Sequence, residues 1–123
     1  MDASDIKELF APVMPVRCRR MFGGHGVYDG DLMFGLEVEG EVFLKSDAQS
    51  IDAFKAAGSR PFTYDKSGKA TVVLSYWLLP EAARDDDDAL RVWVRLALQA
   101  AERSARAKSA VKPRRAAPPS RLR

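Results

Sequence analysis

The chain has 123 residues, 46% of them hydrophobic and 30% charged, as in a soluble domain large enough to bury a core. No apolar run approaches the roughly 18 residues of a membrane span, and the acidic start Met1–Asp5 lacks the features of a leader peptide, so we expect a cytoplasmic protein. Cys18 is the only cysteine, which excludes an internal disulfide and a cysteine-based zinc cluster. We interpret it as a small buried side chain rather than a reactive thiol.

The chain up to Val13 has the spacing of a short amphipathic helix. Ser4 is a suitable N-cap, and Pro12 and Pro15 should end the helix, because proline lacks an amide donor and disfavours helix in the residue before it. The apolar residues recur at intervals of three and four and would form one buried stripe: Ile6, Leu9, Phe10 and Val13.

Four short strands joined by tight turns are expected next, as an antiparallel meander. They are Val16–Phe22, Gly26–Tyr28, Leu32–Glu39 and Glu41–Ser46. The third alternates two sets of side chains, so one face should be core and the other at least partly wet. The first set is Leu32, Phe34, Leu36 and Val38, and the second is Met33, Gly35, Glu37 and Glu39. In the fourth strand, Val42 and Leu44 should face the core, opposite Phe43 and Lys45.

The second half predicts a helix, a hairpin and a longer helix. The first helix, capped by Ser46 or Asp47, should end at Gly58. A hairpin from Phe62 to Leu79 follows, and the apolar run in its second strand should be central or covered by a helix. Asp85–Asp88 then starts the last helix, because negative charge at a helix N-terminus is favourable. The order α-β-β-β-β-α-β-β-α indicates an α+β fold with an antiparallel sheet of about six strands.

The charge is unevenly distributed along the chain. From Arg103 to the end there are eight basic residues and no acidic one, which leaves 12 basic and 17 acidic residues in residues 1–102. We therefore expect a folded domain over residues 1–102 and a basic, disordered tail over residues 103–123. The tail could neutralise the phosphates of nucleic acid, or fold back on the acidic body. Its basic residues are Arg103, Arg106, Lys108, Lys112, Arg114, Arg115, Arg121 and Arg123.

The run Arg19–Tyr28 places basic, apolar and glycine residues where a simple core strand would alternate. With Met33-Phe34, Val42–Lys45, Pro61–Tyr64, Ser75-Tyr76 and Pro80, it resembles the N-terminal domain of the TfoX/Sxy regulators of natural competence. The resemblance implies helices packed on one side of the sheet, in a layout similar to type III secretion chaperones. It also implies transcription regulation of DNA transformation through a partner DNA-binding regulator, without catalysis or cofactor. Longer members of the family carry a second, helical domain where this chain has its basic tail.

Structural explanations outweigh reaction chemistry at each candidate motif. Gly23–Gly26 could cradle a phosphate with Arg19 and Arg20, but no helix follows it, and a bulge or turn is the better account. His25, the only histidine, is then a loop residue. The four aspartates suit helix initiation better than a cation loop. Solvated positions explain the acidic side chains of the third and fourth strands better than acid–base chemistry does: Glu37, Glu39 and Glu41.

We therefore expect no catalytic, cofactor-binding or metal-ligating residue, and a protein that is not an enzyme. The interaction candidates on the body are Arg19, Arg20, Met33, Phe43 and Lys45. A protein partner, namely a transcription regulator, is the first expectation, with a homodimer also open. The alternatives are a nucleic-acid-binding accessory protein that acts through its tail, and a small-molecule site around Arg19, Arg20 and His25.

Overall fold

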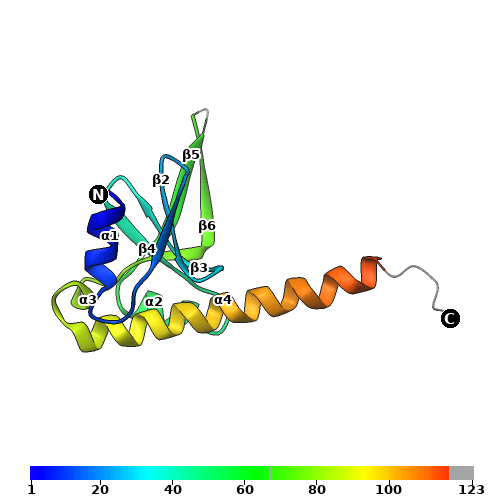
Figure 1. Ribbon diagram of the computed structural model, residues 1–123. Coiled ribbons are helices and arrows are strands. Elements are labelled where there is room, and N and C mark those ends of the chain that lie inside the picture. The colour runs from blue at the N-terminus through cyan, green and yellow to red at the C-terminus, as the bar shows by residue number, and fades with distance from the viewer. Residues whose placement is uncertain (67, 117–123) are drawn as a thin grey trace.

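The computed structural model describes residues 1–66 and 68–116, which form one antiparallel sheet with helices on one face (Figure 1). The helices are α1 (Ala3–Phe10), α2 (Ile51–Ala56), α3 (Ala82–Asp85) and α4 (Asp87–Ala116). The strands are β1 (Arg17–Met21), β2 (Gly24–Asp29), β3 (Leu32–Val38), β4 (Glu41–Lys45), β5 (Pro61–Lys66) and β6 (Lys69–Leu78). They lie side by side in the order β1-β2-β3-β4-β6-β5. The predicted α+β order is confirmed, with the short helix α3 added before the last one.

Helix α1 begins at Ala3, because Asp2 rather than Ser4 is its N-cap. The Asp2 side chain accepts a hydrogen bond from the amide of Asp5 at 2.9 Å, and the Asp5 side chain accepts one from the amide of Asp2 at 3.0 Å. This reciprocal arrangement is a capping box, and it satisfies two amides that would otherwise have no partner in the helix.

The main core lies between the sheet and the helices. Phe54 of α2 is fully buried there, and its ring centroid lies 6.4 Å from that of Trp77 in β6 and 4.8 Å from that of Trp93 in α4. Burial of one such side chain stabilises the fold by about 1.5–3 kcal/mol. The core therefore fixes α2 and the first half of α4 against the sheet. Its other fully buried residues include Ile6, Phe10, Val27, Phe34, Val42, Leu44 and Ala97.

A bulge in β3 changes which side chains face the helices. Val27 lies opposite Gly35, whereas the next residue, Tyr28, lies opposite Met33, so that Phe34 is an extra residue in its strand. Phe34 packs in the main core. Beyond it, the alternation of the strand is reversed.

This reversal corrects the predictions for Leu36, Glu37 and Val38, of which Val38 packs on the face away from Phe34. Leu36, predicted to share a face with Phe34, lies opposite Phe43 on the face away from the main core. Glu37, predicted to be solvated, lies opposite the core residue Val42 and is only 3% exposed. The prediction assumed uninterrupted alternation, which one extra residue breaks. The faces predicted for β4 are confirmed, with Val42 in the main core and Phe43 on the other side.

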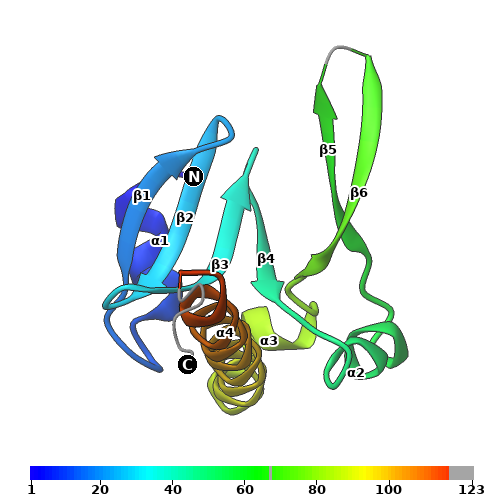
Figure 2. The same ribbon diagram turned by 90° about the vertical axis from the view of Figure 1, so that its right-hand side faces the viewer.

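The sheet curls enough to form a second, smaller core on its other face. The β1–β2 and β5–β6 hairpins rise on either side of β3 and β4 (Figure 2). Phe22, in the turn after β1, contacts Phe62 and Tyr64 of β5, with ring centroids 6.4 and 5.1 Å apart. Beneath these rings, Leu36 and Phe43 are 1% and 2% exposed. Phe43 is therefore part of a core and not of an open face.

The first half of β6 has a neighbouring strand on one side only. β5 pairs with it as far as Lys69, whereas β4 pairs only with the stretch that begins at Tyr76, because the chain leaves the sheet after Lys45 to form α2. The turn end of the β5–β6 hairpin accordingly stands apart from β4 (Figure 2). Val72 and Leu74 are 56% and 58% exposed. The prediction that this run is central or helix-covered is therefore wrong for Val72 and Leu74. It is confirmed for Tyr76 to Leu78, which lie between β4 and β5. The point at which β4 ends could not be predicted from the sequence of β6.

Helix α4 crosses the sheet and continues well beyond it (Figure 1). Asp86 is extended, separates α3 from α4, and accepts a hydrogen bond from the amide of Asp88 at 2.9 Å, as expected for aspartates at a helix start. Residues from Arg103 to Ala116, predicted to belong to a disordered tail, are helical. Alanine, arginine and lysine are strong helix formers, and they dominate this segment. We call residues 103–116 the arm; residues 117–123 lie outside the described part of the chain.

Candidate interaction surface

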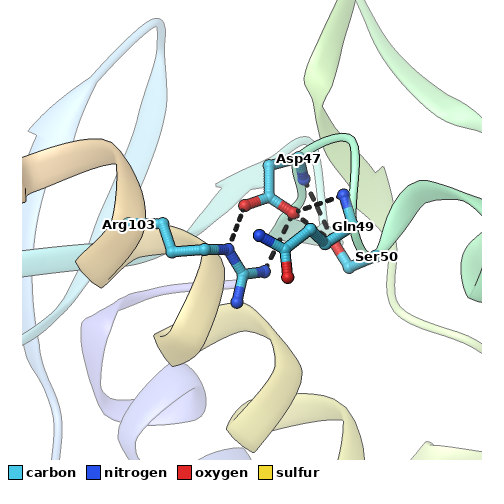
Figure 3. Close-up of polar contacts among 4 residues, drawn as sticks. All are labelled: Asp47, Gln49, Ser50 and Arg103. Carbon is cyan, nitrogen blue, oxygen red and sulfur yellow. Dashed lines mark hydrogen bonds and ion pairs between the residues drawn. The ribbon is translucent and has the colours of Figure 1, made fainter. Parts of the chain in front are cut away.

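The arm is joined to the body by an ion pair between Arg103 and Asp47 (Figure 3). Arg103 Nε lies 2.6 Å from Asp47 Oδ2, and its second donor, Nη2, lies 2.9 Å from Oδ1. Both side chains are about a quarter exposed, at 27% and 26%. Two parallel hydrogen bonds between planar groups fix direction as well as distance. The pair therefore holds the start of the arm against the loop between β4 and α2.

Asp47 is itself held by the loop between β4 and α2. Its Oδ1 accepts hydrogen bonds from the amide of Gln49 at 3.1 Å and from the hydroxyl of Ser50 at 3.4 Å (Figure 3). The hydrogen bonds from Arg103 hold the pKa of the Asp47 carboxyl below its usual range, against the effect of burial. Ser46 or Asp47 was predicted to cap α2, but the N-cap is Ser50. The Asp47 carboxylate instead forms the ion pair with Arg103 of the arm.

A groove of about 570 Å³ opens where the arm leaves the body. Its apolar wall consists of Ile51 from α2 and Leu74 from β6, and Leu74 is well exposed. Arg103 and Ser104 form the side that belongs to α4. The remaining lining residues belong to the end of β4, the loop that follows it and the bend in β6: Lys45, Ser46, Asp47, Ala48, Gln49 and Ser75.

Lys45 brings positive charge to one rim of this groove. Its ammonium lies 5.1 Å from the centroid of the Tyr76 ring, in the range of a cation–π contact. Burial lowers the pKa of Lys45, and the nearby positive charge of Lys108 on the arm lowers it further. Burial also raises the pKa of Tyr76 to about 12. An anionic group between Lys45 and Lys108 would relieve the repulsion of these two cations.

The other predicted interaction residues do not form one face. Arg19 and Arg20 are both exposed, but as successive residues of a strand they point to opposite sides of the sheet. Arg19 lies over the Tyr28 ring at 5.7 Å from its centroid, and Arg20 lies opposite His25. Met33 is partly buried against the smaller core, in which Phe43 is enclosed. Among the predicted body residues, Lys45 therefore lines the groove, and the two arginines do not converge on a small-molecule site.

His25 and Glu37 form a buried contact that the sequence did not suggest. His25 Nδ1 lies 2.7 Å from Glu37 Oε1, and the second carboxylate oxygen accepts a hydrogen bond from the amide of Gly40 at 2.9 Å. A Cβ on Gly24 would lie 1.8 Å from the carbonyl oxygen of Glu37. Only glycine therefore fits at this point, where β2 and β3 approach closely. The glycine-rich run thus serves close strand approach. His25 was predicted to be a loop residue, but it belongs to β2 and lies opposite Glu37 of β3.

The basic residues predicted for the tail fall into four groups. Arg103 is engaged by Asp47, whereas Arg106 and Lys108 are exposed on the arm. Lys112, Arg114 and Arg115 lie farther along the same helix. Arg121 and Arg123 lie outside the described residues.

A comparison with known protein families identified one match. The TfoX N-terminal domain matches residues 8–101, which is well over half of the sequence. The chain belongs to this family. The match covers the sheet and the part of α4 that packs on it, and it ends two residues before Arg103 begins the arm. No curated protein matched this TfoX-type domain. Among the described residues, no helix combines the length and apolar character that a membrane crossing requires.

Proposed function

We propose that this TfoX-type domain is a non-catalytic regulatory module that works in the cytoplasm by contact with a protein partner, a transcription regulator. Family membership supports the regulatory class. The observation that carries the proposal is the corner between the arm and β6, where exposed apolar and cationic side chains adjoin a groove. Such a corner offers a surface to another macromolecule, because apolar anchors beside charged rims are typical of protein interfaces.

The process that fits the family is the regulation of DNA uptake genes. The test is deletion of the gene in the native cell, with transcripts of those genes and transformation frequency as the readouts. Both should fall, and the full chain supplied in trans should restore them. A tagged chain should also precipitate an identified DNA-binding regulator. Unchanged transcripts and transformation after deletion would reject this function.

A second candidate function is nucleic-acid binding through the arm. It is favoured by the exposed side chains of Arg106 and Lys108 on a helix that projects from the body (Figure 1). Binding of this kind is independent of sequence and weakens steeply with salt. A chain ending at Ser104 removes these charges but keeps Arg103 on Asp47, so the body is unaltered. Binding to arbitrary duplex should disappear in that truncation, and unchanged binding would reject the candidate.

A further inference from the structure

The first half of β6 has an edge with backbone groups that no neighbouring strand of the described residues pairs with. Its outward backbone groups can be assigned from two observations. The carbonyl of Leu74 accepts hydrogen bonds from the Ser46 hydroxyl and the Trp77 indole, both at 2.9 Å, and therefore points away from β5. Because successive residues of a strand point their backbone groups to alternate sides, those of Val72 and Ala70 also point away from β5. Lys69, Thr71 and Val73 are then the residues that bond to β5, as the pairing of Lys69 with Lys66 at the hairpin end requires.

This edge adjoins the end of β4 across an irregularity in β6, where Trp77 pairs with Pro61 but Val73 pairs with the next residue, Phe62. β4 occupies the place beside β6 up to the pair Lys45–Tyr76, after which the chain turns away into α2. Beyond that point, the described residues provide no strand beside Ala70 and Val72. An extended peptide beside this part of β6 could form the hydrogen bonds that β4 does not.

The side chains along this edge indicate what such a peptide would carry. Val72 and Leu74 are more than half exposed, and Leu74 forms part of the groove wall. The charge here is mainly positive: Lys45 lines the groove, Lys108 of the arm is near enough to act on it, and the Asp47 carboxylate is already engaged by Arg103. Alternating apolar and acidic side chains would match this pattern. A nucleic acid matches it less well, because it has no row of amides and carbonyls to pair with a strand edge.

We infer that the β6 edge from Ala70 to Leu74, together with the groove beneath it, binds an extended acidic–apolar segment of a partner protein by β-strand addition. This inference rests on the proposed function, for which it names the contact surface. The segment pairs with the outward backbone groups of Ala70 and Val72, places an apolar side chain against Leu74, and directs a carboxylate between Lys45 and Lys108.

The test uses the full chain and a short synthetic peptide in which valine alternates with glutamate, with a valine–lysine peptide as the comparison. Fluorescence anisotropy should show binding of the glutamate peptide and at least tenfold weaker binding of the lysine peptide. Hydrogen exchange should slow at the amides of Ala70 and Val72 when the glutamate peptide is bound. Equal binding of both peptides, or no protection of these amides, would overturn the inference.

Three variants make the test specific. Val72→Pro removes an amide that points away from β5, and Leu74→Lys adds charge to the apolar wall; each should weaken binding of the glutamate peptide at least tenfold. Val92→Lys is the matched control, because Val92 is 55% exposed on α4 and lies outside the groove. It should bind as the wild type does. If Val72→Pro does not fold, Leu74→Lys alone decides, and wild-type affinity in a folded Leu74→Lys chain refutes the site.

Other occupants would give different results. Protection of Ala70 and Val72 that rises with protein concentration, without peptide, would assign the edge to a second copy of the chain and overturn the inference. Displacement of the glutamate peptide by a short DNA duplex would assign the groove to nucleic acid, also against it. If an identified regulator binds the wild type and Leu74→Lys equally, this site fails while the proposed function stands. If no regulator binds, the function fails, whatever the peptide shows.

Discussion

Replacement of Glu37 by alanine tests whether its buried contacts hold the middle of the sheet together. The carboxylate accepts hydrogen bonds from His25 and from the amide of Gly40, and it is 3% exposed. A hydrogen bond to a charged group contributes about 1.5–3 kcal/mol, so two would contribute about 3–6 kcal/mol. Part of this is offset, because the variant no longer buries a carboxylate, and that desolvation costs several kcal/mol. We therefore expect Glu37→Ala to lower the free energy of unfolding by about 2–3 kcal/mol.

The assay is urea denaturation at neutral pH, followed by circular dichroism, with the wild type and Glu37→Gln alongside. The glutamine keeps an acceptor for one of the two donors and buries no charge, so its loss should be about 1 kcal/mol. A double-mutant cycle with His25→Ala isolates the contact between the two side chains and should give a coupling of about 1 kcal/mol. An alanine variant as stable as the wild type would refute the reasoning, since the contacts would then not repay the burial of the carboxylate.

Three further predictions concern the body of the domain. Gly24→Ala should destabilise the fold by about 1–3 kcal/mol or more in the same urea assay, because its Cβ would overlap the carbonyl of Glu37; a loss below that range would show that the strands can move apart cheaply. Phe54→Ala should cost about 3–5 kcal/mol of unfolding free energy by thermal and urea denaturation, and a loss under 1 kcal/mol would mean that α2 is not part of the core. Asp47→Asn should be less stable than the wild type at pH 7, and the difference should shrink as the pH falls. The reason is that the pKa of Asp47 is lowered by Arg103, so its contribution is present above the ordinary carboxyl pKa and is lost as the pH falls through the folded-state value; a difference that is constant with pH would contradict this.

Local patterns were sufficient to predict the order of the elements. The spacing of Ile6 and Phe10 and the alternation of Val42 with Phe43 each report on one helix or strand and its own buried side. Such patterns are set by the geometry of a single element, which is why they survive in the folded molecule. The glycine at position 58 likewise marked the end of α2, where its φ of +76° allows the last turn to close.

The features that define the candidate surface depend on relations between distant segments. The extra residue Phe34 reverses β3 because of how β2 pairs with it, and nothing in β3 alone reveals this. The exposure of Leu74 follows from the point at which β4 ends, about thirty residues earlier in the chain. The pairing of Asp47 with Arg103 joins residues 56 positions apart. Composition did identify the basic segment. It did not show that Arg103 pairs with Asp47 or that the arm is helical.

The most direct test of the account is made in the native cell, with Leu74→Lys and Val92→Lys in place of the wild-type chain at equal protein abundance. Both variants convert a valine or leucine that is more than half exposed into lysine, but only Leu74 lines the groove. Transcripts of the DNA uptake genes should fall to the level of the gene deletion with Leu74→Lys and stay at the wild-type level with Val92→Lys. Wild-type transcript levels with Leu74→Lys would contradict the claim that this domain acts by contact at the corner between β6 and the arm.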